Sequence, residues 1–247
     1  MKAHEYAAMF DAEQKHWWFK NLRNEVAYWI QNASPAKPVS KKKLLDLGCG
    51  TGGLLCHLQA RFKNLAAWGM DYYAVALDFA KQRTVYPLVR GDVKSLPFHK
   101  ATFDFITCLD VLYTREAYPG FQQTLDDVYE LLRENGVFIL QLPAFEFLKS
   151  QHDLNCHGMH RFTASEIRAS LRQAGFRRYK IYYRYNLLFG FAWVIRKILR
   201  REENESHVLT PGPLINFLLQ TYFAGESGLN KRLTVPFGLS VFAVAYR

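Results

Sequence analysis

The chain has 247 residues, of which 49% are hydrophobic and 15% aromatic, and its formal net charge is +10 at pH 7. This composition excludes global disorder, and the length fits one α/β domain with additions or two small domains. No apolar run reaches the ~18 residues of a membrane-spanning helix, and the charged N-terminus is unlike a signal peptide. The basic balance favours an anionic partner, such as nucleic acid, an acidic membrane surface or a phosphorylated substrate.

The four cysteines form no C-x-x-C pair and no paired framework. They are typical of reduced thiols in a cytosolic protein. We therefore expect a cytoplasmic location, with peripheral attachment to the inner membrane face as an additional site.

Aromatic and charged residues alternate at helical spacing over 1–33, which predicts one or two helices before a Pro/Lys connector at 34–43. The core of this segment is the sequence HWWFKNLR. Neighbouring side chains point in different directions on a helix. We therefore expect one of Trp17 and Trp18 to pack and the other to cover something else.

Strands and helices alternate from there on, which predicts βαβ units and a parallel sheet. The expected strands are 43–48, 65–70, 86–90, 103–109 and 136–142. The expected helices are about 52–62, 73–83 and 119–133, with a turn at Asn135 and Gly136. Ligands bind beyond the carboxyl ends of the strands in such sheets.

The pattern changes after Pro143. A histidine-rich connection at 144–162 leads to a capping box, TASE, which opens a helix ending at Gly175. Alternating residues predict two more strands at 177–185 and 239–246. We expect three parts: an N-terminal helical lid, a cofactor-binding core and a helical insert. Their limits are 1–40 for the lid, 41–185 with 237–247 for the core, and 186–236 for the insert.

The stretch LLDLGCGTGG at 44–53 is an apolar run that ends in an acid and breaks into glycines. This pattern predicts a buried strand, a tight turn and a helix N-terminus. Glycines allow positive φ and close approach of a ligand, and the helix start offers unpaired N–H groups. The loop therefore predicts a site for a nucleotide-type ligand.

Three carboxylates bear on which ligand this is. Asp46, just before the first glycine, suits a cationic ligand better than a pyrophosphate. Asp71 ends the second expected strand, where an acid accepts hydrogen bonds from ribose hydroxyls. Asp92 follows the third strand and could accept from an adenine amino group, with Val93 packing on the ring.

Together these motifs resemble the class I S-adenosylmethionine-dependent methyltransferases, in particular bacterial small-molecule members. LLDLGCGTGG looks like the first motif of that family, GMD like its ribose acid and GDVKSLPF like its adenine motif. FDFITCLDVL and LRENGVFILQLP resemble its fourth-strand and fifth-strand segments. The resemblance covers about residues 15–185 and the last strand. It implies a Rossmann-like, seven-stranded, mostly parallel sheet with an antiparallel last strand, and the cofactor S-adenosyl-L-methionine.

The resemblance also assigns roles to residues. The methionine end of the cofactor would contact Asp46 and the loop backbone, the ribose Asp71, the adenine Asp92 and Val93, and Leu109 would line the sulfonium side. HWWFKNLR resembles an N-terminal helix of the family, in which Arg23 would pair with the cofactor carboxylate and Trp18 or Phe19 would close over it. The full set expected at the cofactor is Trp18, Arg23, Asp46, Gly48, Cys49, Gly50, Gly52, Asp71, Tyr72, Asp92, Val93 and Leu109.

The segment expected to carry a catalytic base departs from the family pattern. Many relatives carry a D-V-L-E-H pattern after the fourth strand, whereas this chain reads DVLYT, with Tyr113 and Thr114 in place of Glu and His. The candidate catalytic residues are His157, His160, Tyr113 and Asp110. His157 and His160 could both reach the pocket if their loop is helical. The histidines of this loop lack a second acidic or cysteine pair, so no metal site is expected.

The insert is the part least like the family. An apolar run at 187–195 is followed by arginines and a lysine, which suits a helix at an anionic membrane surface. A cap on the core of the domain, or a lid over an apolar substrate, explains the same pattern. No RNA-binding module is evident, so nucleic acid is disfavoured as a partner.

We therefore expect a methyltransferase that acts on a small, lipophilic acceptor: an isoprenoid or other natural product, or a lipid-linked saccharide. The sequence does not choose between O-, N- and C-methylation. Two alternatives stay open. One is an NAD-dependent oxidoreductase that uses the same glycine loop. The other is a membrane-attached cofactor-binding protein without catalysis.

Overall fold

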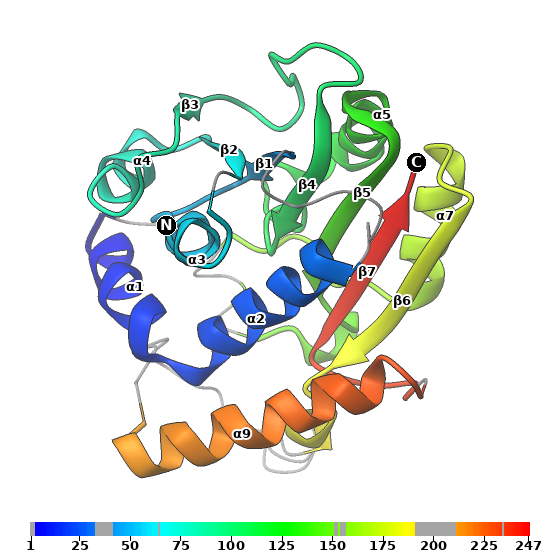
Figure 1. Ribbon diagram of the computed structural model, residues 1–247. Coiled ribbons are helices and arrows are strands. Elements are labelled where there is room, and N and C mark those ends of the chain that lie inside the picture. The colour runs from blue at the N-terminus through cyan, green and yellow to red at the C-terminus, as the bar shows by residue number, and fades with distance from the viewer. Residues whose placement is uncertain are drawn as a thin grey trace.

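The computed structural model describes residues 3–32, 42–63, 65–150, 153, 157–190, 211–233 and 235–247. Over these residues the chain forms one seven-stranded sheet in the order β3-β2-β1-β4-β5-β7-β6 (Figure 1). The strands are β1 (Lys43–Leu47), β2 (Ala66–Asp71), β3 (Leu88–Arg90), β4 (Phe103–Leu109), β5 (Leu132–Pro143), β6 (Arg178–Arg184) and β7 (Ser240–Tyr246). Neighbours from β3 to β5 are parallel, and β7 is antiparallel to both β5 and β6. The predicted fold class is confirmed.

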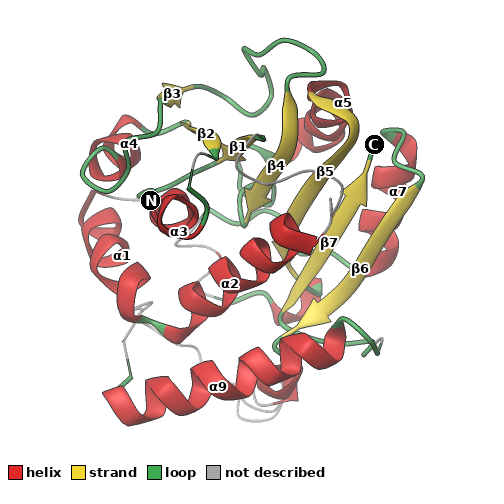
Figure 2. Ribbon diagram, viewed as in Figure 1, coloured by secondary structure: helices red, strands yellow, loops and turns green. Residues whose placement is uncertain are grey.

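Helices cover both faces of the sheet (Figure 2). The α-helices among the described residues are α1 (Ala3–Lys15), α2 (Trp17–Asn32), α3 (Gly53–Arg61), α4 (Ala74–Ala80), α5 (Phe121–Leu131), α7 (Ala164–Gln173) and α9 (Pro213–Asn230). Buried residues of α2, α3 and α4 pack on one face, and those of α5 and α7 pack on the other. Because strand side chains alternate between faces, Leu44 of β1 packs on the face that α2, α3 and α4 cover, while Leu45 and Leu47 pack on the face that α5 and α7 cover. This two-sided burial explains the continuous apolar runs of the central strands.

β5 starts earlier than the sequence predicts. The strand begins at Leu132, directly after α5, and the expected turn lies within it. The β4–β5 pairing jumps from Phe103 with Leu132 to Phe105 with Val137, so extra residues are accommodated between the two pairs. Asn135 takes a positive φ of 62° there. The turn residues therefore mark an irregularity in the pairing, not the start of the strand.

Both tryptophans of HWWF pack into the same aromatic cluster, so the expectation that only one of them packs is wrong. The ring of Trp17 stacks on Phe223 of α9 at 4.8 Å between centroids, and the ring of Trp18 stacks on Tyr185 at 3.9 Å. The two residues are the first of α2. A cluster that surrounds the end of a helix can contact side chains that point in different directions.

α9 is anchored to the core of the domain through Glu25, which is buried on α2. The Glu25 carboxylate accepts hydrogen bonds from the hydroxyls of Tyr182 and Ser227 and from Trp29 Nε1 at 2.9 Å, and it pairs with Lys231 Nζ at 3.0 Å. A charge at this depth needs such partners. The C-terminal half of the insert therefore packs beside α2 and β6 (Figure 1). Most of the expected membrane-surface run at 187–201 lies outside the described residues.

Candidate active site

The glycine loop joins β1 to α3 and leaves no room for a side chain at its first glycine. The backbone N–H groups of Gly48 and Cys49 both donate to the carbonyl of Met70, at 2.7 and 2.9 Å. Gly48 has a φ of 71°, and a Cβ at this position would overlap Val111 Cγ2. Gly50 and Gly52 also have positive φ. The expected turn at the carboxyl end of β1 is present.

Asp71 connects the end of β2 to the glycine loop. Its two carboxylate oxygens accept backbone N–H groups of Gly50 and Tyr73, each at 2.9 Å. Burial raises the pKa of Asp71, although these hydrogen bonds act against the shift. The next residue, Tyr72, is half exposed. An acid next to an ordered loop backbone is the arrangement expected for ribose recognition.

Asp46 lies inside the protein, on β1. It is 4% exposed and accepts a hydrogen bond from Thr107 Oγ1 at 2.6 Å. Burial raises the pKa of Asp46 to about 7. Leu109, at the end of the neighbouring strand β4, packs with the core on the α3 side. Asp46 thus presents a carboxyl group whose charge depends strongly on a nearby cation.

The adenine motif forms a turn after β3. Asp92 accepts the backbone N–H of Lys94 at 3.0 Å and pairs with its Nζ at 3.3 Å. Val93 is buried in the core. Its carbonyl accepts a hydrogen bond from Thr124 Oγ1 at 3.0 Å, which ties this turn to α5. Asp92 is therefore at the surface while Val93 is held below it.

α1 covers the glycine loop. The buried carboxylate of Glu13 accepts hydrogen bonds from Thr51 Oγ1 and Arg83 Nη1, both at 2.5 Å. A Cβ at Gly53 would lie 2.5 Å from this carboxylate. Sequence reasoning missed Glu13 and Arg83, because the contacts join residues 38 and 70 positions apart and no motif marks them.

Arg23 and Trp18 lie on different sides of α2. Arg23 Nη1 donates to the carbonyl of Glu13 at 2.6 Å, near the glycine loop. Trp18 stacks on Tyr185 beyond the end of β6. Five positions along a helix rotate a side chain by well over a quarter turn, which explains the separation. Arg23 thus lies closer than Trp18 to the part of the chain expected to hold the methionine end.

The two candidate histidines do not come together. The described residues from 157 to 162 are not helical, which removes the basis for their expected juxtaposition. His157 Nδ1 lies 3.0 Å from Glu116 Oε1, and the same oxygen accepts the hydroxyl of Tyr73 at 3.0 Å. This chain of contacts links the loops after β2 and β4. Sequence reasoning missed Glu116 and Tyr73.

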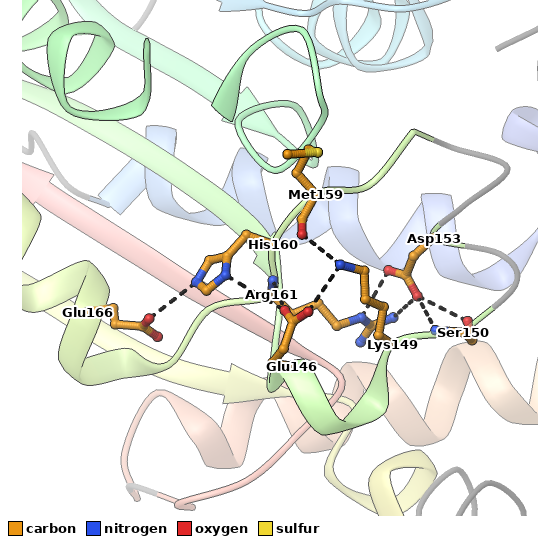
Figure 3. A network of polar contacts seen from close by, with 8 residues as sticks. All are labelled: Glu146, Lys149, Ser150, Asp153, Met159, His160, Arg161 and Glu166. Atoms are coloured by element: carbon orange, nitrogen blue, oxygen red, sulfur yellow. Dashed lines mark hydrogen bonds and ion pairs between the residues drawn. The ribbon is translucent and has the colours of Figure 1, made fainter. Parts of the chain in front are cut away.

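His160 belongs to a network that holds the 144–162 loop (Figure 3). Its Nε2 lies 3.2 Å from Glu166, at the start of α7, and its Nδ1 lies 3.7 Å from Glu146. Arg161 makes a two-pronged ion pair with Asp153, at 2.9 and 3.0 Å. Among the described contacts, His160 therefore bonds to carboxylates of its own loop and of α7, which favours a structural role.

Asp110 is the first residue of a polar row across the carboxyl ends of the strands. Its carboxylate accepts from Gln141 Nε2 at 2.8 Å, and Gln141 Oε1 accepts from Arg184 Nη1 at 2.5 Å. Burial raises the pKa of Asp110 to about 6. Asp110, Phe145 and Tyr185, which follow β4, β5 and β6, all have positive φ, a strained state that is common near functional sites.

Tyr113 is buried in the core that faces α5 and α7. Its carbonyl accepts the backbone N–H of Met159 at 2.8 Å, and Gly158 lies so close to its ring that a Cβ would be 2.9 Å from Cε2. This packing suggests that Tyr113 supports the histidine loop from below.

Comparison with known proteins identifies the family. The methyltransferase domain family matches residues 18–180, which is more than half of the chain. The chain belongs to the methyltransferase domain family. The match covers the glycine loop and the expected ribose and adenine acids, and it confirms the class I S-adenosylmethionine-dependent resemblance. S-adenosyl-L-methionine is accordingly the cofactor of this methyltransferase domain.

Several relatives support this assignment. The chain is 31% identical to trans-aconitate 2-methyltransferase of Deinococcus radiodurans over 65% of this chain and 57% of that protein. It is 30% identical to fatty-acid O-methyltransferase of Mycolicibacterium smegmatis over 41% of this chain and 37% of that protein. The methyltransferase domain thus spans about half the length of the curated relatives it matches.

Solved structures show the same fold. A chain of the complex that contains the Haloferax volcanii Trm112 methyltransferase activator aligns with a TM-score of 0.61 at 20% identity, over 99% of this chain and 93% of that one. Phosphoethanolamine N-methyltransferase 2 of Haemonchus contortus, solved with S-adenosyl-L-methionine, aligns with a TM-score of 0.59 at 15% identity, over 91% of this chain and 52% of that one. At these identities the likeness concerns the fold alone.

Proposed function

We propose that this chain transfers a methyl group from S-adenosyl-L-methionine to a small, lipophilic acceptor, such as an isoprenoid, another natural product or a lipid-linked saccharide. The observation that carries the proposal is a phenylalanine cluster formed by residues 145, 147, 189 and 237. Phe145 contacts Phe147 and Phe189 at 5.4 and 5.5 Å between ring centroids, and Phe189 contacts Phe237 at 5.3 Å. Phe147 is 54% exposed.

The position of the phenylalanine cluster supports a role in acceptor binding. Phe145 and Phe147 follow β5, Phe189 follows β6, and Phe237 precedes the antiparallel β7. All four therefore lie at the carboxyl edge of the parallel strands, where α/β sheets bind ligands. Partly exposed aromatic rings there favour an acceptor that has a large apolar part.

The names of the relatives agree with this acceptor class in part. Fatty-acid O-methyltransferase and the phthiotriol/phenolphthiotriol dimycocerosates methyltransferases act on lipophilic molecules by name, whereas trans-aconitate is small and polar. The family match favours methyl transfer over the NAD-dependent alternative.

The chain's own residues would position the acceptor and manage its proton. S-adenosyl-L-methionine, when bound, supplies a methyl group on a sulfonium that needs no further activation. The protein then contributes proximity, orientation and exclusion of water. For a hydroxyl acceptor, His157 is the best-placed base, because a proton on Nδ1 shared with Glu116 leaves Nε2 free to accept one. For an alkene acceptor, the ring of Phe145 in the phenylalanine cluster would stabilise a cationic intermediate.

Incubation of the protein with methyl-labelled cofactor tests the acceptor class. A lipid extract and an aqueous metabolite extract serve as separate acceptor pools. We expect label in the organic phase, and we expect Phe147→Ser to weaken transfer more than Val85→Ser, which replaces an exposed apolar residue on the loop between α4 and β3. Label that enters only aqueous products would contradict a lipophilic acceptor.

We further infer that α9 rests on an anionic membrane surface. No helix among the described residues is long and apolar enough to span a bilayer. α9 nevertheless exposes large apolar side chains along one side, including Leu214 at 71% and Phe217 at 64% exposed. Such a face suits shallow insertion into a bilayer; α9 itself carries no Lys or Arg, so the attraction to anionic headgroups would come from the rest of a protein of net charge +10.

Sedimentation with vesicles of mixed neutral and anionic phospholipid tests this contact. We expect the double variant Phe217→Ser with Leu218→Ser to sediment less than the wild type, and Val85→Ser to behave like the wild type. Equal sedimentation of all three would show that the α9 face does not bind the bilayer.

A further inference from the structure

A small polar cavity opens between α2, α3 and α9. Its volume is about 270 Å³, and it is lined by Lys20, Arg23 and Asn24 of α2, His57 of α3 and Gln220 of α9. This volume is below that of a site for a drug-sized molecule and fits a small polar group. The described lining contains two cations, one imidazole and two amides, and it contains no carboxylate.

Two buried nitrogen atoms of this lining lack a partner among the described residues. They are Nε of Arg23 and Nε2 of His57. Buried polar atoms are nearly always hydrogen-bonded in folded proteins, so an orphaned donor calls for a ligand or a solvent molecule. The two residues that carry these atoms belong to different helices and line the same cavity, which is how a convergent binding site is built.

The charge around the cavity is unbalanced. On α1, the carboxylate of Glu13 accepts hydrogen bonds from Thr51 and Arg83, and its charge also acts on Arg23. Burial and the charges of Arg23 and Arg61 lower the pKa of His57 to about 4. Glu13 therefore offsets the charge of Arg23 in part, but no described carboxylate lines the cavity beside Lys20, so the lining still favours an anion.

We propose that this cavity binds a phosphate group through Lys20, Arg23 Nε, His57 Nε2 and the amides of Asn24 and Gln220. A tetrahedral anion with several acceptor oxygens can satisfy both orphaned nitrogens at once, which a planar carboxylate does less well. The phosphate is that of the methyl acceptor or free inorganic phosphate. The link to the acceptor rests on the proposed function, whereas the anion site itself does not.

The phosphate site includes one residue of the insert. Gln220 is its only contribution from α9 among the lining residues, and α9 is fixed to α2 through Glu25. A phosphate held here would bridge the N-terminal helix, the helix behind the glycine loop and the insert. Binding should therefore also stabilise the folded protein.

Calorimetric titration of the full chain at constant ionic strength tests the proposal, with inorganic phosphate and glycerol 3-phosphate as probes. We expect saturable binding of at least one probe to one site. Because each variant removes a hydrogen bond to a charged group, Lys20→Met and His57→Gln should each weaken binding by about tenfold or more. Lys81→Met, at an exposed lysine after α4, should leave it unchanged. A preference for the ester would assign the site to an acceptor, and a preference for inorganic phosphate would assign it to the free ion.

An NMR measurement on the wild type keeps the test valid even if the variants fold poorly. In an NMR pH titration of the wild type, phosphate should raise the pKa of His57, because a nearby negative charge favours the imidazolium. No binding of either probe, or unchanged binding in both variants, would overturn the proposal.

Competition with S-adenosylhomocysteine separates this site from the cofactor site. We expect phosphate to bind equally well with that product present. If the product displaces phosphate and both variants also weaken binding of the product, the cavity holds the methionine carboxylate and the proposal is overturned. If the wild type binds phosphate but transfers no methyl group to either acceptor pool, that result counts against the proposed function alone.

Discussion

The carboxylate of Asp71 accepts the backbone N–H of Gly50 at 2.9 Å, so the last residue of β2 and the middle of the glycine loop are held together before any ligand binds. Ordering of this kind lowers the entropy cost of binding, because the site is already in place. The same relationship makes Asp71 the residue of this site whose replacement is most informative.

We predict that Asp71→Ala weakens binding of S-adenosylhomocysteine at least about tenfold, since a hydrogen bond to a charged group contributes about 1.5–3 kcal/mol. Calorimetric titration measures the change. Asp78→Ala, which removes an exposed carboxylate from α4, is the matched control and should bind normally. Equal affinities for wild type and Asp71→Ala would show that Asp71 orders the loop without touching the ligand.

Gly48→Ala should destabilise the fold. The left-handed backbone costs a non-glycine residue about 1–2 kcal/mol, and the added methyl overlaps Val111 at a cost of about 1–3 kcal/mol. Urea unfolding should therefore show a loss of about 2–5 kcal/mol in the free energy of unfolding. Adding Val111→Ala should recover part of the loss. Gly228→Ala, in an open position of α9, should be neutral or stabilising. A tolerated Gly48→Ala would contradict the described loop.

The pair of His157 and Glu116 gives a kinetic prediction. If the acceptor is a hydroxyl, His157→Gln should lower kcat by about 10²–10⁴-fold while binding of S-adenosylhomocysteine stays normal. Glu116→Gln should lower kcat less, because it disturbs the orientation of the imidazole without removing it. His99→Gln, at an exposed histidine before β4, is the control. Normal turnover in His157→Gln would remove this residue from the mechanism and favour an acceptor that needs no base.

Asp46 gives a prediction about pH. Burial raises its pKa from 3.8 to about 7, so between these values the folded state keeps a proton that the unfolded chain has released. The free energy of unfolding of the cofactor-free protein therefore falls as pH rises through this window. Asp46→Asn keeps an acceptor for Thr107 but cannot ionise. Its stability relative to wild type should improve by about 2–3 kcal/mol between about pH 5 and about pH 8. Parallel curves would contradict the raised pKa.

Much of the sheet follows from local pattern. The strands β1, β2 and β4 were predicted within two residues, because strands buried on both faces give continuous apolar runs bounded by turn residues. The capping box at Thr163 is present, with both reciprocal hydrogen bonds. β5 was misplaced at its start because Asn135 and Gly136 look like a hairpin turn, whereas the pairing with β4 absorbs them.

Site residues could be predicted from the sequence only where they belong to a local motif. The glycine loop and the acids after β2 and β3 stand at fixed distances along the chain. Glu13, Glu116 and the Trp18–Tyr185 stack depend on contacts between residues 38 to 167 positions apart, which no local pattern encodes. The same limit explains why His157 and His160 were grouped: adjacency in sequence suggested a shared site, while Glu116 and Glu166 hold them apart.

One measurement tests the central claim most directly. The purified wild-type chain is titrated by calorimetry with S-adenosyl-L-methionine, S-adenosylhomocysteine and NADH under the same conditions. We predict that the first two bind competitively at a single site and that NADH does not bind. Binding of NADH without binding of either sulfur-containing ligand would contradict the assignment of the glycine loop and, with it, the account of this protein as a methyltransferase.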